Sequence, residues 1–353
     1  MRRYAILAPG EFSTDAKTAH GVIAYGSDET VVVIDPTCAG KTVRQVLPHL
    51  RSDVPIVANV AEALKFEPNA LLVGTAPQGG ALPDAWRDQL RAGLRAGIEL
   101  VSGLHDMLGD DPELAALARA NRTTIWDVRR PPAVPLFSGA AYAVEPPVVL
   151  MVGNDCAVGK MTVALELAAA AQRRGKRSSF VPTGQTGIMI AGWGIAVDRV
   201  ISDFASGAAE ALVLYAAESK PDIIFVEGQG GINHPAYAQV TLSLMFGSAP
   251  DGLILVCDPL RGTVSGFEIP TLPYGESIRL HEALLATVKP ARVLGIALNT
   301  SGLNEAEARA HIERARSETG LPADDVVRFG ADALYAAVAP ACTKRLPLRA
   351  IPL

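Results

Sequence analysis

The sequence predicts an α/β protein that contains two doubly wound, mostly parallel-sheet domains. Its 353 residues fit about two domains at the usual size of roughly 150 residues each. Short apolar runs alternate with longer helical stretches along the chain, as expected for parallel strands joined by helices. Hydrophobic residues make up 49% of the chain and aromatic residues only 5%, which favours sheets covered by small-residue helices over an aromatic-rich β-sandwich.

The first domain is predicted to span residues 1–130. Short runs rich in Val, Ile, Leu and Ala predict its strands, at residues 4–8, 21–26, 30–35, 56–59, 69–76, 98–103 and 124–128. The intervening stretches have helical patterns, at residues 41–50, 60–66, 84–97 and 111–121. We interpret residues 131–147 as an inter-domain linker, because five prolines in this segment cannot sustain a helix or a central strand.

The second domain is predicted to span residues 148–353. Its strands are expected at residues 148–153, 178–184, 222–228, 252–258 and 293–299, with a closing strand near 326–330. Two clear helical patterns occupy residues 161–175 and 305–320. We expect Tyr274 and Glu276 to lie in a Pro/Gly-rich loop after the fourth of these strands.

Charge and cysteine content exclude several classes of protein. The net charge is −5, from 32 basic and 37 acidic residues, and no run of Lys and Arg occurs, so nucleic acid is not an expected partner. The four cysteines are widely spaced without a CxxC pair, which argues against a disulfide framework or a zinc site and fits a cytoplasmic protein. No run approaches the roughly 18 apolar residues that a membrane span needs.

A phosphate-binding loop is the strongest motif in the sequence. The segment GNDCAVGKMT follows an apolar strand and opens a helix, and backbone N–H groups of such a turn converge on an anion. The helix adds its positive N-terminal dipole, and Lys160 supplies a point charge for phosphates. The residues predicted to bind the phosphate ligand are Gly153, Asn154, Asp155, Cys156, Ala157, Val158, Gly159, Lys160, Met161 and Thr162.

The loop departs from the GxxxxGK[ST] pattern in two ways. Five residues separate Gly153 from Gly159, and Met161 stands where a hydroxyl residue normally follows the lysine. In a hydrolysing loop that hydroxyl binds magnesium, and Thr162 would be rotated by about 100° around a regular helix. Phosphate binding therefore survives the change, whereas magnesium-assisted phosphoryl transfer becomes a weaker prediction.

A carboxylate is predicted close to this loop. The segment FVEGQGG (225–231) reads as a buried strand that ends at Glu227 and continues in a Gly-rich turn. This segment, together with Asp155 inside the loop, resembles the dethiobiotin-synthetase branch of P-loop proteins.

Several segments in both domains resemble the DUF1611 family. They are GNDCAVGKMT, PTGQTG (182–187), FVEGQGG, GLHDMLGDDPEL (103–114), GTAPQGGALPDAWR (74–87) and DVRRPP (127–132). The resemblance runs along nearly the whole chain. It implies a Rossmann-like N-terminal domain and a P-loop NTPase-like C-terminal domain. It also implies an N-acetyltransferase that uses acetyl-CoA on D-glutamate, in D-amino-acid catabolism.

The implied activity suits the loop, since coenzyme A carries a pyrophosphate and a 3′-phosphate and acetyl transfer needs no magnesium. The alternative is an ATP-dependent kinase or carboxylate-activating ligase of the dethiobiotin-synthetase type, with Mg-ATP on the same loop. A third alternative is a regulator that binds CoA or a nucleotide without catalysis. In every case the expected partners are small molecules, and the chain is expected to form a homo-oligomer, with a dimer as the first choice.

Acetyl transfer to an amine requires a base, an oxyanion donor and an anchor for the substrate carboxylates. The candidate catalytic residues are Glu227, His234 and Asp258, and His281 is a further candidate base. Backbone amides of residues 183–187 or 228–231 are candidate oxyanion donors. The predicted substrate-binding residues are Thr183, Gln185, Thr186, Gln229 and Arg261, and no metal site is predicted.

The first domain raises a separate question. Asp35 ends a predicted strand, where an acid often binds a ribose hydroxyl. The sequence GxGxxG is absent, however, so no nicotinamide cofactor is predicted. We expect instead a second ligand pocket, or a contribution of this domain to the amino-acid site.

Overall fold

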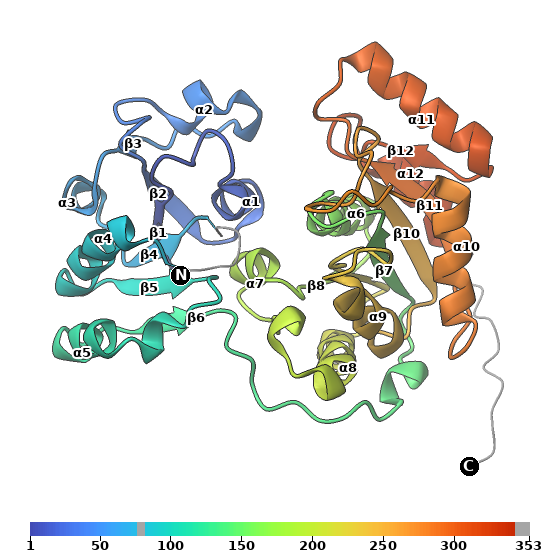
Figure 1. The fold of residues 1–353 in the computed structure, drawn as a ribbon, viewed down its shortest axis with the longest axis horizontal. Helices are drawn as coiled ribbons and strands as arrows, with labels where there is room; N and C mark the ends of the chain where they lie inside the picture. The colour runs from blue at the N-terminus through green and yellow to red at the C-terminus, as the bar shows by residue number, and fades with distance from the viewer. Residues whose placement is uncertain (76–81, 343–353) are drawn as a thin grey trace. The chain divides into compact units, whose positions relative to one another are not determined.

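The computed structural model describes residues 1–75 and 82–342, and these form two compact units (Figure 1). The first unit comprises Met1–Pro131 together with Gln185–Ala196. Sequence analysis placed the latter segment in the second domain. Residues 76–81, part of the quoted segment 74–87, lie outside the described residues.

The first unit is built on a six-stranded parallel sheet with the order β3-β2-β1-β4-β5-β6. Its strands are β1 (Arg3–Leu7), β2 (Glu29–Ile34), β3 (Ile56–Val57), β4 (Ala70–Val73), β5 (Glu99–Ser102) and β6 (Ile125–Asp127). Their apolar runs are largely buried because helices cover a parallel sheet on both faces. The order reverses between β1 and β4, and ligands of doubly wound sheets bind at the carboxyl ends of the strands beside such a point.

The helices of the first unit are α1 (Lys17–Tyr25), α2 (Val43–Val46), α3 (Val60–Ala63), α4 (Asp84–Arg95) and α5 (Pro112–Ala120). The prediction of a strand at residues 21–26 is wrong, because this segment belongs to α1. The buried residues of α1 include Thr18, Ala19 and Val22, which follow a helical spacing. A short apolar run does not distinguish a strand from a buried helix, and the parallel connection from β1 to β2 requires the helix.

The second unit, formed by Pro132–Gly184 and the described residues from Val197 onward, also contains a six-stranded parallel sheet. Its order is β12-β11-β10-β7-β9-β8. The strands are β7 (Val148–Gly153), β8 (Ser178–Val181), β9 (Ile223–Val226), β10 (Gly252–Cys257), β11 (Arg292–Leu298) and β12 (Ala323–Asp324). The two sheets confirm the predicted fold class.

The closing strand was predicted a few residues too late. β12 ends at Asp324, and residues 326–329 form a turn. The carboxylate of Asp325 accepts the backbone N–H groups of Val327 and Arg328 at 3.0 Å each. These bonds take up amides that a strand would have donated to its neighbour.

The helices of the second unit are α6 (Lys160–Arg173), α8 (Ser202–Glu218), α9 (Ala238–Gly247), α10 (Tyr274–Leu285), α11 (Glu305–Thr319) and α12 (Asp332–Cys342). Tyr274 and Glu276 were predicted to lie in a loop, but they form the first turn of α10 after Pro273. A further helix, α7 (Gln185–Ala191), belongs to the first unit. Among the described residues, no helix is both long enough and apolar enough to cross a membrane.

The proline-rich segment 131–147 is anchored to α8. Glu210 is buried in α8, and its carboxylate accepts the N–H groups of Ser138 and Ala141 at 2.7 and 3.1 Å. Gly207 allows the close approach, because a Cβ atom there would lie 1.9 Å from the carbonyl oxygen of Pro135. The segment is therefore fixed by backbone contacts that only a small residue on α8 permits.

We predict that Gly207→Ala destabilises the protein by about 2–3 kcal/mol, because the new methyl group overlaps a backbone carbonyl that cannot move aside. Gly275→Ala is the matched control, since it also lies in a helix and its Cβ would meet only the end of Arg279, at 3.5 Å. The control should be neutral or stabilising by up to about 1 kcal/mol. Urea unfolding of both variants tests this, and equal stability of the two would contradict it.

Candidate functional site: a phosphate-binding loop beside a buried carboxyl group

Residues 153–160 connect β7 to α6 at the carboxyl edge of the second sheet. β7 lies between β9 and β10, so the loop opens where the strand order reverses. Gly159 directly precedes α6 and has a backbone φ of 106°. Residues other than glycine rarely adopt this conformation. The sequence therefore folds into a strand, a tight turn and a helix, as the motif predicts.

The loop presents a row of backbone donors. Among the described residues, the N–H groups of residues 157–162 meet no acceptor, whereas the N–H of Val163 already binds the carbonyl of Gly159. These groups include the first turn of α6, where the helix dipole favours negative charge. The arrangement can bind the oxygens of a phosphate.

Lys160 lies at the centre of the site, and its side chain is buried. Its Nζ donates to the carbonyl oxygens of Asp155 and Gly230, at 2.7 Å each. Burial lowers the pKa of its ammonium group to about 8. The lysine thus joins the phosphate-binding loop to the Gly-rich turn after β9.

Two glycines of that turn permit this contact. A Cβ atom at Gly228 would lie 1.6 Å from the carbonyl oxygen of Met151, and one at Gly231 would lie 3.0 Å from the Cα of Asp155. Met161 and Thr162, the residues after the lysine, are both half-buried. Met161 places no hydroxyl group where a hydrolysing loop has one.

Glu227 directly follows β9, and its carboxyl group is buried. Its Oε2 accepts the backbone N–H groups of Thr183 and Gly184, at 2.8 and 3.0 Å. Its Oε1 accepts no hydrogen bond from the described residues. Burial raises the pKa of Glu227 to about 7, although the two amides and the ammonium of Lys160 lower it.

Two predicted substrate-binding residues, Thr183 and Gln229, are hydrogen-bonded to each other. Gln229 donates from Nε2 to the carbonyl oxygen of Thr183 at 2.6 Å, and Thr183 donates from Oγ1 to the carbonyl oxygen of Glu227 at 3.0 Å. The two side chains thereby hold Glu227 from both neighbouring loops. Because Glu227 occupies the amides of Thr183 and Gly184, residues 229–231 are the better candidates for oxyanion donors.

Asp155 connects the loop to a hairpin that follows β10. Its Oδ1 accepts the N–H of Cys156 at 2.7 Å, and its Oδ2 accepts Nη1 of Arg261 and the N–H of Ser265 at 2.7 and 2.8 Å. The hairpin is closed by an antiparallel bridge between Thr263 and Pro270. Asp155 is fully buried, so it binds this hairpin in a region that water does not reach.

Arg261 and Asp258 also form part of this arrangement. Asp258 accepts the N–H of Leu260 at 2.9 Å, and its carboxylate lies 3.8 Å from Nη2 of Arg261. Arg261 therefore already faces two carboxylates, those of Asp155 and Asp258, and a substrate carboxylate would have to compete with them.

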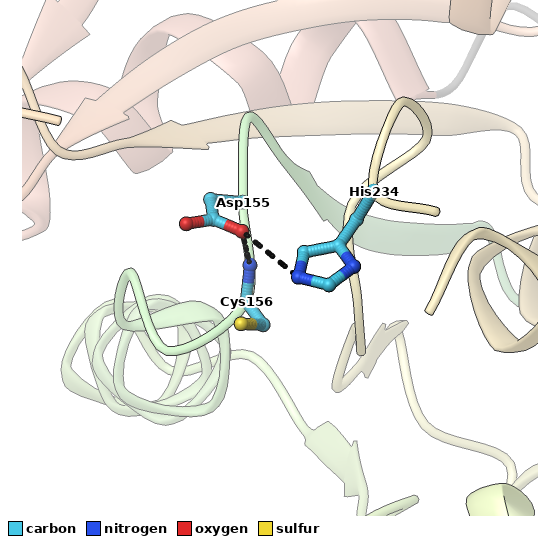
Figure 2. A group of neighbouring side chains, drawn as sticks. All are labelled: Asp155, Cys156 and His234. Atoms are coloured by element: carbon cyan, nitrogen blue, oxygen red, sulfur yellow. Dashed lines mark hydrogen bonds and ion pairs between the residues drawn. The ribbon is translucent and has the colours of Figure 1, made fainter. Parts of the chain in front are cut away.

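His234 lies next to Asp155, as Figure 2 shows, with 4.0 Å between its Nε2 and Oδ1 of Asp155. Its Nε2 is the donor to the carbonyl oxygen of Ser265 at 3.0 Å, and its Nδ1 accepts the N–H of Ala236 at 3.2 Å. A neutral imidazole has one lone pair on its nitrogens, and Ala236 uses it. His234 therefore has no free position from which to take a proton.

The same bonds decide whether this cluster suits a metal ion. Asp155, Cys156 and His234 offer three ligand atoms that lie within 4.8 Å of one another (Figure 2). Protein donors already occupy both carboxylate oxygens, the ring binds two backbone groups, and burial raises the pKa of the Cys156 thiol. A metal ion would need these ligands deprotonated and unbound, so the group does not fit one.

The remaining candidates are His281, Gln185 and Thr186. His281 is fully buried in α10 and donates from Nδ1 to the carbonyl oxygen of Ser277 at 2.7 Å, and burial lowers its pKa to about 4. Gln185 and Thr186 belong to the first unit, where they contact Arg129 and Thr18.

The carboxylate of Asp35, directly after β2, is hydrogen-bonded to the protein's own backbone and to one hydroxyl group. It accepts the N–H groups of Gly10, Phe12 and Thr37 at 2.8–3.1 Å and the hydroxyl of Thr37 at 2.7 Å. Its role is to hold the loop after β1 against the end of β2.

Comparison with known proteins identifies the family. A model of the DUF1611 P-loop domain, described as a domain of unknown function, matches residues 135–335, and a model of the DUF1611 Rossmann-like N-terminal domain matches residues 36–131. The chain belongs to the DUF1611 family. This confirms the resemblance that the sequence motifs predicted.

Three similar proteins illustrate the relationship. A protein of Tritonibacter scottomollicae named D-glutamate N-acetyltransferase is 39% identical over 282 residues, which cover 79% of this chain and 83% of that protein. A Pseudoalteromonas protein of the same name is 37% identical over 281 residues, with the same coverage. The crystal structure of a DUF1611 family protein from Anabaena variabilis is 42% identical, covers 96% of this chain and 100% of that chain, and has a TM-score of 0.91.

Sequence reasoning missed the hairpin and its contact with Asp155. Ser265 contacts His234 and Asp155 through its backbone carbonyl and N–H groups, and a sequence motif does not reveal contacts of that kind. The one available signal was an acid inside a phosphate-binding loop, since a carboxylate beside an anion site requires strong donors of its own.

We predict that Asp155→Asn lowers the free energy of unfolding by about 2–3 kcal/mol, because an amide NH₂ would replace an acceptor of two bonds, one of them from a guanidinium group. Asp258→Asn is the control, as its carboxylate accepts one backbone N–H on the same hairpin. Urea unfolding gives the two stabilities, and limited proteolysis should cut the hairpin only in Asp155→Asn. Equal losses in the two variants would contradict the role of Asp155.

Proposed function

We propose that this member of the DUF1611 family transfers the acetyl group of acetyl-CoA to the amino group of D-glutamate, as a step in D-amino-acid catabolism. The proposal rests on one feature of the structure, a phosphate cradle next to a carboxyl group suited to act as a base. The cradle consists of Lys160 and the backbone N–H groups of residues 157–162. The base is Glu227.

The phosphate cradle supports a coenzyme A ligand. The backbone donors and the helix dipole bind phosphate oxygens without a metal ion, and Lys160 adds a positive charge. Met161 provides no hydroxyl for magnesium, which weakens the case for phosphoryl transfer and leaves the case for phosphate binding intact.

Glu227 supports amine chemistry at the same sheet edge. A base must take a proton from the substrate ammonium, and it works best when its pKa lies near the operating pH. Oε2 of Glu227 is held by two amides, whereas Oε1 has no partner among the described residues. With a pKa raised by burial to about 7, this carboxyl group is ionised for about half of the time near neutral pH.

The reaction balances with these groups alone. Glu227 takes a proton from the ammonium group, and the amine attacks the thioester carbonyl to form a C–N bond. The carbonyl oxygen becomes an oxyanion, for which the amides of residues 229–231 are the candidate donors. The C–S bond then breaks, the nitrogen loses its second proton, and the thiolate of coenzyme A leaves and takes up one proton. Glu227 releases the proton it took from the ammonium group to solvent, so one proton is released overall. The products are N-acetyl-D-glutamate and free coenzyme A.

Two relatives support the same substrate and reaction type, since both are named D-glutamate N-acetyltransferase and are 37–39% identical to this chain over 281–282 residues. The rival proposal is an ATP-dependent kinase or carboxylate-activating ligase on the same loop.

A direct assay separates these proposals. The purified protein is incubated with D-glutamate and either acetyl-CoA or Mg-ATP, and the release of free thiol and of ADP is followed. Thiol release that requires D-glutamate, is weaker with L-glutamate and persists in EDTA is the expected result. ADP release without thiol would overturn the proposal in favour of the kinase or ligase. Tight binding of coenzyme A without either product would indicate a regulator.

We predict that Glu227→Gln lowers kcat about 10²- to 10⁴-fold, the usual contribution of a general base. The variant should remain folded, because the amide oxygen can still accept the two N–H groups that Oε2 accepts. In the native protein, kcat/KM should rise with pH and level off above a pKa near 7, because Glu227 is active only when deprotonated. In Glu227→Gln, this rise of kcat/KM with pH (the acidic limb of the profile) should disappear. If the rise persists in the variant, the pKa near 7 belongs to another group.

We predict that Lys160→Ala weakens binding of coenzyme A about 10- to 100-fold, the effect of one charge-assisted hydrogen bond. Isothermal titration with coenzyme A, 3′-dephospho-CoA and pantetheine identifies the phosphate involved. If the loop holds the 3′-phosphate, the variant and native protein should bind dephospho-CoA equally well. If it holds the pyrophosphate, the loss should persist with dephospho-CoA, and pantetheine binding should be unaffected in both cases.

A further inference from the structure

The carboxyl edge of the first sheet is where a doubly wound fold usually binds its ligand. The strand order β3-β2-β1-β4-β5-β6 is that of dinucleotide-binding sheets. Thr18 follows β1, Gly103 follows β5 and Arg129 follows β6, so all three lie at this edge. Each of the three contacts α7.

The contacts with α7 are close and directional. Arg129 is buried, and it donates from Nε to the carbonyl oxygen of Gly103 at 2.6 Å and from Nη2 to Oε1 of Gln185 at 2.7 Å. The hydroxyl groups of Thr18 and Thr186 lie 3.0 Å apart. A Cβ atom at Gly103 would lie 2.7 Å from Cγ of Gln185, so glycine is needed for this packing.

The sheet edge thus holds a helix of the same chain. Residues 187–190 of α7 are buried, and Asp35, the acid at the end of β2, uses its carboxylate on the protein's own backbone. In Figure 1, α7 is yellow-green and the other helices and strands of the first unit are blue to cyan, because α7 follows β8 in the sequence.

The residues just before α7 belong to the proposed active site. The N–H groups of Thr183 and Gly184 hold Oε2 of Glu227, and Gln185 is the next residue along the chain. On the other side of the segment, the N–H of Val197 donates to the carbonyl oxygen of Thr183 at 3.0 Å. One end of residues 185–196 therefore continues directly from Gly184, and the residue after the other end is hydrogen-bonded to Thr183.

We propose that Arg129 and Gln185 are positioning residues for Glu227, and that the first unit serves to hold α7 and through it the amides of Thr183 and Gly184. This inference rests on the proposed function, in which Glu227 is the base. It assigns the Rossmann-like unit a role in the reaction without a nucleotide of its own.

The surroundings of Glu227 determine the direction of the expected change. Burial is the largest influence and raises its pKa, whereas the amides of Gly184 and Thr183 lower it. Two charged side chains also act on it, Asp198 raising the pKa and Lys160 lowering it. If the amides of Thr183 and Gly184 no longer bind Glu227, its pKa rises. The rise of kcat/KM with pH should then occur at higher pH.

The test compares Gln185→Ala with Gln185→Glu. Gln185→Ala removes the side-chain acceptor that joins Nη2 of Arg129 to α7, and the acidic limb of kcat/KM should move up by on the order of one pH unit. Gln185→Glu restores an acceptor for Arg129 and should return the limb to its native position. If Gln185 instead bound the substrate carboxylates, Gln185→Glu would raise KM strongly with an unmoved limb, and this result would overturn the proposal.

Two measurements are independent of the activity. Hydrogen exchange of residues 182–196 should become about tenfold faster in Gln185→Ala and in Gly103→Ala. The infrared band of the protonated Glu227 carboxyl group, identified by its loss in Glu227→Gln, should titrate at higher pH in both variants. Unchanged exchange, or faster exchange with an unchanged titration, would overturn the proposal. Absence of thiol release in the native protein would overturn the proposed function, and the infrared titration would still test the link from α7 to Glu227.

Discussion

The burial of the Lys160 ammonium group is the interaction on which the site depends. A buried charge is costly unless it has hydrogen-bond partners, and Lys160 finds them in the carbonyl oxygens of Asp155 and Gly230. These two bonds fix the phosphate-binding loop against the turn after β9. The turn can approach only because Gly228 and Gly231 lack side chains. The lysine therefore shapes the loop as well as supplying its charge.

Much of the fold was predictable because both sheets are parallel and buried on both faces. The apolar runs that became β7, β9, β10 and β11 are long enough to identify from composition. α1 was mistaken for a strand because its run of apolar residues is short, and α7 was missed because Gly187 and the polar residues before it suggest a turn. The place of α7 in the first unit depends on contacts with distant residues, which local sequence patterns do not contain.

The sequence was sufficient to predict which residues could carry the chemistry of the site. Lys160 was predicted from its place in the loop motif, and Glu227 from its place at the end of a buried strand. Hydrogen-bond partners were not predictable. Thr183, Gln229 and Arg261 have the side chains of substrate-binding residues, yet each binds protein groups that the fold brings within 3.0 Å. A polar residue near a Gly-rich turn can hold the groups of a neighbouring loop whether or not it also contacts a ligand, and only the tertiary structure shows those protein partners.

The buried carboxyl group of Glu227 also lowers the stability of the folded protein when it is ionised. Its pKa is raised from 4.5 to about 7 in the folded state, so between these values the folded protein holds a proton that the unfolded chain has lost. The contribution of this group to stability is therefore fully present below pH 4.5 and is lost as the pH rises through 7. At the pH where the carboxylate acts as a base, the fold tolerates a buried charge that favours unfolding. The amides of Thr183 and Gly184 limit this penalty, which explains why a catalytic carboxylate needs rigid support from the chain around it.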